Sequence, residues 1–210
     1  LVLGDIDLSV GSTVALSATL LGVSYNAGLP MGAAIVIALL CGTLCGLING
    51  IILTKFTELA SMIVTLGTMT LYRGIAEMIL GSQSTGGLQN VTWFYNLYYA
   101  RLGAVPYIFI VFCVLAIAFG FVLHKTTFGR YLYAIGNNRV VARYSGIPVQ
   151  TIRLICFTLV GFVCGISAIY YANRLLQFPD HFSHFRGRKN LGRMLSPDHH
   201  GEKSFSEMLR

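Results

Sequence analysis

The sequence predicts an all-α fold, a polytopic bundle of transmembrane helices, and three observations lead to this prediction. Charged residues make up 11% of the 210 residues, whereas a soluble domain carries about a quarter. The mean hydropathy is +0.68. The apolar residues gather in runs of about 20 residues, the length of helix that crosses a bilayer. We expect about five hydrophobic segments, some of them discontinuous helices, embedded in a lipid bilayer.

Four of these segments are long enough, or nearly so, to cross a bilayer as helices. They cover residues 31–53, 59–80, 107–124 and 154–172. A fifth segment, residues 8–21, is short for a full crossing. Its length predicts a half-helix, or a helix that pairs with residues upstream of this chain.

The connections between the segments predict the topology. The loop 125–153 holds five basic residues and no acidic one, so the positive-inside rule places it in the cytoplasm. The loop 81–106 carries aromatic residues typical of the membrane interface, and it then lies outside. Because successive helices cross the membrane in opposite directions, the turn 54–58 lies in the cytoplasm and the turn 25–30 outside.

We divide the chain into a transmembrane domain, residues 1–175, and a polar basic tail, residues 176–210. If the segment 154–172 crosses outward, this tail lies outside, which conflicts with the positive-inside rule. A frame change or a fusion scar would explain such a tail. We read the net charge of +7 as membrane topology, so nucleic acid is not an expected partner.

The sequence shows no catalytic or metal-binding pattern. It has no GxxxxGK[ST] phosphate loop, so we do not expect the chain to hydrolyse ATP, and no GxSxG or HExxH motif. The five cysteines lie singly in apolar segments and are interpreted as core residues. The histidines of the tail favour a solvated segment over a metal site. We therefore expect neither an enzyme nor a cofactor or metal.

Small residues mark two expected helix-packing faces. Gly42, Gly46 and Gly50 recur every fourth residue, and Gly161 and Gly165 repeat this spacing. Such faces allow helix backbones to approach closely. We expect packing within the bundle, with a subunit contact or a moving seam as the alternative.

The cytoplasmic loop contains a short predicted helix. Asn138 is a suitable N-cap, and Gly146 followed by Pro148 suits a helix end. Val140 and Tyr144 are four residues apart and share a face. A two-turn helix with an apolar face and two arginines is typical of a docking element, although a simple surface connection explains it equally well.

Four stretches then reveal a family resemblance. They are IDLSVGS at 6–12, GLING at 46–50, IVTLGTM followed by YRG at 63–74, and TFGRYLYAIGNN with ARYSGI at 127–147. In this order they resemble the motifs of ribose-type monosaccharide ABC transporter permeases, the inner-membrane components of binding-protein-dependent transport systems. The resemblance covers roughly residues 1–175, and four motifs in sequence make it specific.

The resemblance implies a bacterial inner-membrane protein of about ten helices. Such permeases work as a pair of identical or paralogous membrane subunits, driven by cytoplasmic ATP-binding subunits. A periplasmic sugar-binding protein delivers the monosaccharide. We therefore expect this chain to be a fragment, incomplete at both ends, whose tail is unrelated to the family or disordered.

The resemblance also assigns roles to residues. It makes the loop helix the coupling element that docks on an ATPase subunit, formed by Asn138, Arg139, Ala142, Arg143, Ser145 and Gly146. The candidates for the translocation path are polar side chains at membrane depth: Asp7, Ser9, Asn49, Thr65 and Thr68. For each of these, a hydrogen bond between helices is an equal alternative to substrate contact.

Two other functions are considered. An ion-coupled secondary transporter would use Asp5 and Asp7, or Arg73 and Glu77, as its ion site. A membrane scaffold or a truncated, non-functional permease product would insert without transporting anything.

The two aspartates near the start differ in their expected roles. Asp7 belongs to the motif and is expected to accept hydrogen bonds from the free N–H groups at a helix start. Asp5 stands where the resembling motif has glycine. We therefore expect Asp7→Ala to be more harmful than Asp5→Gly.

Overall fold

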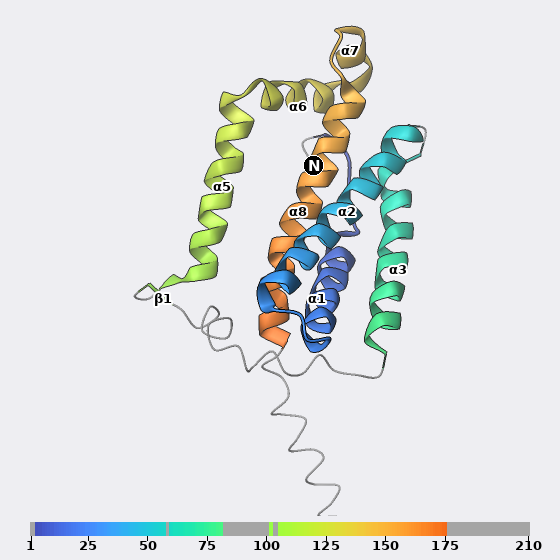
Figure 1. Cartoon of the computed structure of the whole chain (residues 1–210). Coiled ribbons are helices and arrows are strands. Elements are labelled where there is room, and N and C mark those ends of the chain that lie inside the picture. Colours follow the sequence, from blue (N-terminus) through green and yellow to red (C-terminus); the bar gives the residue numbers. More distant parts are fainter. Residues whose placement is uncertain (1–2, 58, 82–100, 103–104, 176–210) are drawn as a thin grey trace, which may run out of the picture. The chain divides into compact units, whose positions relative to one another are not determined.

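The computed structural model describes residues 3–57, 59–81, 101–102 and 105–175. The chain divides into two units, Leu1–Leu176 and Gln177–Arg210, and the second lies outside the described residues, so the predicted tail is not described. The first unit is built of helices, as predicted, with one short strand pair. Figure 1 shows its elements. They are α1 (Val10–Asn26), α2 (Met31–Lys55), α3 (Ser61–Leu80), β1 (Arg101–Leu102), β2 (Val105–Pro106), α5 (Tyr107–Lys125), α6 (Thr127–Asn137), α7 (Arg139–Tyr144) and α8 (Val149–Leu175).

Three helices in the described part of the chain are long and apolar enough to cross a membrane: α2, α3 and α8. A fourth crossing arises if α5 and α6, bent by 77° against each other, count as one broken span. These helices agree with the four predicted spans to within about five residues at each end. Prolines 30, 106 and 148 immediately precede α2, α5 and α8, because proline suits the residue at or before the first helical position.

The segment predicted as a half-helix is longer than expected. Helix α1 begins at Val10 and runs to Asn26, so the polar residues Ser24 to Asn26 continue it. Gly28, with a φ of +91°, turns the chain before α2. At 17 residues, α1 is about 25 Å long.

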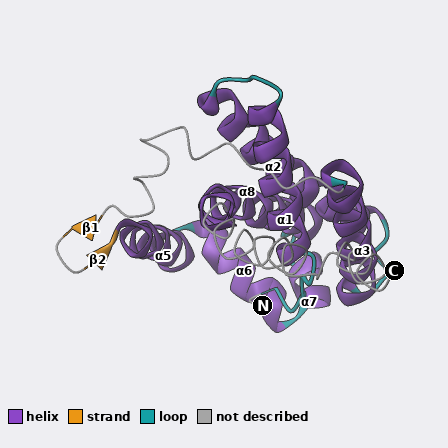
Figure 2. Cartoon of the chain, turned by 90° about the horizontal axis from the view of Figure 1, so that it is seen from below, coloured by secondary structure: helices purple, strands orange, loops and turns teal. Residues whose placement is uncertain are grey.

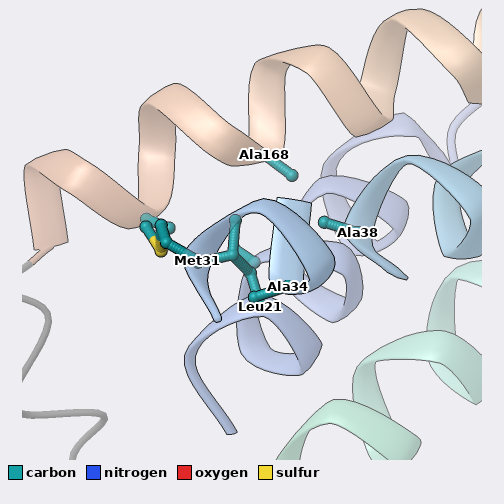
Figure 3. Close-up of a cluster of buried hydrophobic side chains, with 7 residues drawn as sticks. Leu21, Met31, Ala34, Ala38 and Ala168 are labelled. Carbon is teal, nitrogen blue, oxygen red and sulfur yellow. The ribbon is translucent and has the colours of Figure 1, made fainter. Parts of the chain in front are cut away.

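Helices α1, α2 and α8 form the centre of the bundle, and α3 packs mainly against α1. Seen from below, α3 and α5 lie on opposite sides of this centre (Figure 2). The main contacts of α5 are with α6 and β2. One cluster of buried side chains joins the central helices and includes Leu21, Met31, Ala34, Ala38 and Ala168 (Figure 3). Alanine dominates it because short side chains let the helices lie close together.

The glycines of α2 and α8 face each other at the closest helix contact. A Cβ atom added to Gly42 would lie 2.6 Å from the carbonyl oxygen of Gly161. One added to Gly46 would lie 2.8 Å from the Cα of Gly161. Gly165 packs in the same way against Leu39, where the distance from an added Cβ to the Cα is 3.0 Å. Both glycine faces therefore pack within the bundle, backbone against backbone.

The bundle buries polar side chains and exposes apolar ones. Ser9, Asn49 and Thr65 are at most 1% exposed, whereas Ile117 is 73% and Met78 is 84% exposed. In a bilayer, exposed apolar side chains contact lipid, and polar side chains lie inside the protein. The buried polar groups gather at one end of the bundle, near the start of α1.

Candidate functional site

The start of α1 is bound to α2 and α3 by a chain of polar side chains. The Ser9 hydroxyl donates to Asp7 Oδ1 at 2.7 Å, and Asn49 Nδ2 of α2 donates to Ser9 Oγ at 2.8 Å. The Tyr72 hydroxyl of α3 donates to Asn49 Oδ1 at 3.2 Å and to the Cys45 carbonyl at 3.1 Å. Three helices thus share one buried hydrogen-bond network.

A second branch joins the segment before α1 to the start of α3. Thr65 Oγ1 donates to the carbonyls of Ser61, at 2.9 Å, and Ile6, at 3.3 Å. The Ile6 N–H donates to Ser61 Oγ at 3.3 Å, and the Thr68 hydroxyl donates to the Thr65 carbonyl at 3.3 Å. The two branches meet at the adjacent residues Ile6 and Asp7. We call the whole set the polar cluster: Asp7, Ser9, Asn49, Thr65, Thr68 and Tyr72.

The structure therefore brings all five predicted path residues together and adds Tyr72. Each makes a hydrogen bond inside the protein, and the bond between Asn49 and Ser9 joins α2 to the start of α1. The Thr68 hydroxyl, by contrast, bonds within α3 to the Thr65 carbonyl. Tyr72 was missed as a hydrogen-bond donor. A signal existed, because Thr65, Thr68, Tyr72 and Ala76 recur at helical spacing and form the buried face of α3.

The expectation for Asp7 is met at one N–H group at the start of α1. The N-cap of α1 is Ser9, whose side chain makes no capping hydrogen bond. Asp7 instead accepts from the Ser9 N–H at 2.9 Å, an Asx-turn one step before the helix. Ser9 has a helical φ of −78° and ψ of −9°, and the Asp7 carboxylate lies beside its N–H and hydroxyl groups.

Asp5 is the centre of an ion cluster that the sequence did not predict. Arg153 of α8 donates from Nε to Asp5 Oδ2 at 2.7 Å and from Nη2 to Oδ1 at 2.8 Å. Arg139 of α7 donates from Nη2 to the same Oδ1 at 3.0 Å and to the Leu3 carbonyl at 3.1 Å. Arg153 Nη1 also donates to the Leu53 carbonyl of α2 at 2.7 Å. We call Asp5, Arg139 and Arg153 the Asp5 ion cluster.

Two of its three members are buried. Asp5 is 7% and Arg153 3% exposed, whereas the side chain of Arg139 is 40% exposed. Burial raises the pKa of the Asp5 carboxyl, but the hydrogen bonds and charges of Arg153 and Arg139 outweigh it and hold the pKa below its usual value. The carboxylate is therefore charged at neutral pH.

The short helix predicted in the loop is α7. Asn138 caps it, because its Oδ1 accepts from the N–H groups of Val140, at 3.0 Å, and Val141, at 3.1 Å. Gly146, with a φ of +79°, turns the chain after it. Ala142 is buried, and it joins a cluster of buried side chains from α6 and α8. Figure 1 shows α7 at the end of α8 next to α6.

The outer surface of α7 is apolar and basic. Val140 is 62%, Val141 58% and Tyr144 88% exposed, and Arg143 is exposed beside them. The six predicted coupling residues thus divide into two groups. Ala142 and Arg139 hold α7 on the bundle and Asn138 caps it, whereas Arg143, Ser145 and Gly146 are exposed. We call Val140, Val141, Arg143 and Tyr144 the α7 surface.

A cavity of about 500 Å³ lies between α1, α5, α6 and α8. Its lining is apolar almost throughout, with side chains such as Val14, Phe119, Leu159 and Val163. A sugar needs several hydrogen-bonding partners when it leaves water, so this cavity does not fit a sugar. Among the described residues, no three His, Cys, Asp or Glu side chains form a metal site. The tail histidines, in the pairs 181/184 and 199/200, lie outside those residues.

Comparison with known families decides the class of the protein. The sequence model of the branched-chain amino acid transport system permease component matches residues 1–183. The chain belongs to this permease family. The match confirms the resemblance found in the motifs, and the membrane-spanning helices of the described residues agree with a multi-pass membrane protein.

Curated relatives of the permease are autoinducer 2 import system permease proteins LsrD. The protein from Yersinia enterocolitica is 38% identical over 174 residues, which are 80% of this chain and 52% of the relative. The protein from Klebsiella pneumoniae is 34% identical over 170 residues, 79% of this chain and 51% of the relative. The chain thus spans about half the length of the curated relatives it matches. No solved structure matches it.

Removing the Tyr72 hydroxyl tests the polar cluster of the permease. Tyr72→Phe keeps the ring but leaves Asn49 Oδ1 and the Cys45 carbonyl without this donor. We expect it to lower the stability by about 1–2 kcal/mol, measured as the midpoint of thermal unfolding in detergent. Tyr133→Phe on α6, where Tyr133 is 48% exposed, is the matched control and should leave the midpoint unchanged. Equal midpoints for both variants would contradict the network.

Proposed function

We propose that this chain is the membrane-spanning subunit of an ATP-driven sugar importer. In this proposal it forms part of the translocation path and docks a cytoplasmic ATP-binding subunit through the α7 surface. Its further partners are a second permease subunit, identical or paralogous, and a periplasmic sugar-binding protein. The substrate class is a monosaccharide or a related small furanose. Family membership and the names of the relatives support the class of transporter.

The observation that carries the docking proposal is the exposure of the α7 surface. A six-residue helix held by its cap and by buried Ala142 has no structural need for two exposed valines, an exposed tyrosine and an exposed arginine. Tyrosine and arginine are enriched among the residues that contribute most to protein interfaces. The surrounding loop carries no acidic residue, so the partner surface that it fits is acidic or apolar.

We also propose a role for the polar cluster. Its hydrogen bonds join Asn49 of α2 to Ser9 at the start of α1 and to Tyr72 of α3. Thr65 of α3 bonds to the Ile6 carbonyl before α1. These bonds support a function in fixing α1 against α2 and α3 beside the translocation path. Because a sugar is neutral, hydroxyl and amide groups are sufficient along its path, and the path needs no charged side chain.

The ion-coupled alternative loses its basis in the geometry. Asp5 is neutralised by two arginines and Asp7 is bound to Ser9. Arg73 and Glu77 form an exposed pair of their own, with Nε and Oε1 3.3 Å apart. An ion site would need a carboxylate that is available to the ion inside the protein.

The docking proposal is tested on the full-length permease by reversing the charge of the α7 surface. Arg143→Glu should lower co-purification of the ATP-binding subunit roughly tenfold, because a charge change in an interface opposes a complementary partner. Membrane abundance should stay constant, since Arg143 is exposed and its side chain is not part of the contacts described between α7 and the bundle. Arg130→Glu makes the same change at an exposed site on α6. If both variants weaken association equally, the effect belongs to the charge of the loop and α7 docking is refuted.

A further inference from the structure

The segment 3–9 touches both the docking helix and the polar cluster. At its first residue, Leu3 packs into a buried cluster with Leu132, Ala142 and Ile152, from α6, α7 and α8. Its carbonyl accepts from Arg139 of α7. The segment is thus attached directly to α7, although about 134 residues of chain separate Asp5 from Arg139.

The last residues of the same segment are attached to α2 and α3. Ile6 bonds to Ser61 and Thr65 of α3, and Ser9 bonds to Asn49 of α2. Only Ile6 stands between Asp5 and Asp7, so about 7 Å of extended chain joins the ion cluster to the polar cluster. A displacement of Asp5 over a few ångströms therefore cannot be absorbed within the segment without moving its bonds to α2 and α3.

The two arginines on Asp5 differ in what they connect. Arg153 is buried and chelates the carboxylate with two nitrogens, while its third nitrogen bonds to the end of α2. This contact fixes α8, α2 and the segment together. Arg139 is partly exposed and holds Asp5 through the single atom Nη2. It lies at the first residue of α7, so it is the side chain through which a movement of α7 reaches Asp5.

We propose that Arg139 is a positioning residue that couples α7 to the polar cluster through Asp5 and the segment 3–9. This inference rests on the proposed function, because it needs an ATP-binding subunit that moves α7. It assigns Arg139 to the transmission of movement and leaves docking to the α7 surface. The resembling motif has glycine at position 5, so the connection belongs to this chain.

The alternative connections of α7 are weaker. On one side α7 follows α6, which continues into α5, and the main contacts of α5 are with α6 and β2. On the other side α7 leads into α8 past Gly146 and Pro148, a turn that can change its angle. Among the described residues, the side-chain hydrogen bonds that join α7 to the segment before α1 both come from Arg139, which donates to the Asp5 carboxylate and to the Leu3 carbonyl.

The experiment uses the full-length permease assembled with its transporter and compares two arginines of the same helix. Arg139→Gln removes the charge that holds Asp5. We expect association with the ATP-binding subunit to stay within about twofold, while sugar taken up per ATP hydrolysed falls about fivefold or more, the usual lower range of allosteric coupling. Arg143→Gln is the matched control, and it should weaken association without changing the ratio of uptake to ATP hydrolysis.

The conservative variant adds a readout that a merely structural role would not give. Because one nitrogen of Arg139 makes both of its bonds, the ammonium of Arg139→Lys can replace it. We expect Arg139→Lys to restore the ratio of uptake to ATP hydrolysis. Loss of association in Arg139→Gln with an unchanged ratio overturns the proposal and makes Arg139 a docking residue. Loss of thermal stability with an unchanged ratio overturns it as well.

A measurement on the unaltered transporter keeps the test independent of any folding defect. When ATP binds, amide hydrogen exchange should change in residues 3–9 together with α7. A change confined to α7 overturns the proposal while the docking function stands. If the wild-type permease does not associate with an ATP-binding subunit at all, the proposed function itself fails, and the two failures are thus distinguishable.

Discussion

Asp5→Ala is expected to destabilise the permease by about 3–5 kcal/mol, the usual cost of removing one partner of a buried ion pair. The change leaves Arg153 as a buried cation that is 3% exposed and has lost its carboxylate. It also leaves Arg139 bound to the segment before α1 through the Leu3 carbonyl alone. The measurement is the thermal unfolding midpoint of the full-length permease in detergent, together with its abundance in the membrane.

Asp7→Ala is the matched comparison, because it removes the same group two residues away. Asp7 is only partly buried, and it bonds to the N–H and the hydroxyl of Ser9. Its loss is expected to cost about 1–2 kcal/mol. This ranking reverses the expectation drawn from the motif, where Asp7→Ala was to be the more harmful change. A larger effect of Asp7→Ala would restore the earlier ranking and contradict the ion cluster.

A double variant separates the ion pair from the general cost of changing Asp5. Asp5→Ala with Arg153→Met removes both charges and keeps an apolar side chain of similar length at position 153. Because the cost of the single variant comes mainly from an unpaired buried charge, we expect the double variant to be more stable than Asp5→Ala. If the stability loss of the double variant equals the sum of the losses of the two single variants, Asp5 and Arg153 do not interact.

The stability that the Asp5 carboxylate contributes should fall as the solution becomes acidic. The pKa of Asp5 in the folded protein lies below its ordinary value, so its stabilising contribution is complete above the ordinary pKa of aspartate, about 3.9. The contribution is lost as the pH falls through the lowered value. The stability difference between the wild type and Asp5→Asn should therefore shrink in this acid range.

The helices could be predicted because their signals are local. Apolar runs of membrane length, prolines before α2, α5 and α8, and the Asn138 cap act within a few residues of each element. The five polar candidates also proved to lie together, since polar side chains in apolar helices face other polar groups. The turn at Asp7 was missed because the apolar pattern starts the segment at residue 8, whereas α1 begins at Val10.

The Asp5 ion cluster could not be predicted because its partners are distant in the chain. Asp5 and Arg153 are 148 residues apart, and nothing in the spacing of charges reveals such a pair. One signal was present in the topology. The basic loop was placed in the cytoplasm and the turn 25–30 outside. A first helix that crosses the membrane completely would therefore begin on the side of the basic loop, where an isolated aspartate has arginines within reach.

The glycine contact between α2 and α8 gives the second large effect. Gly46→Ala places a methyl group against the backbone of Phe157 and Gly161, where the Cα of Gly161 would lie 2.8 Å away. Backbone atoms of two packed helices cannot move aside as a flexible side chain does. We expect the unfolding free energy to fall by about 1–3 kcal/mol, the usual cost of overpacking, and Gly46→Leu to prevent accumulation of the folded permease.

The control for this prediction is a glycine in open space. Gly67→Ala on α3 adds a methyl group that meets no atom within 4 Å, and alanine favours a helix by about 1 kcal/mol over glycine. The thermal midpoint of Gly67→Ala should therefore equal or exceed that of the wild type, while that of Gly46→Ala falls. Gly161→Ala, on the opposite side of the same contact, should resemble Gly46→Ala. If Gly46→Ala is as stable as Gly67→Ala, α2 and α8 do not meet through their glycines, and the seam lies elsewhere in the bundle.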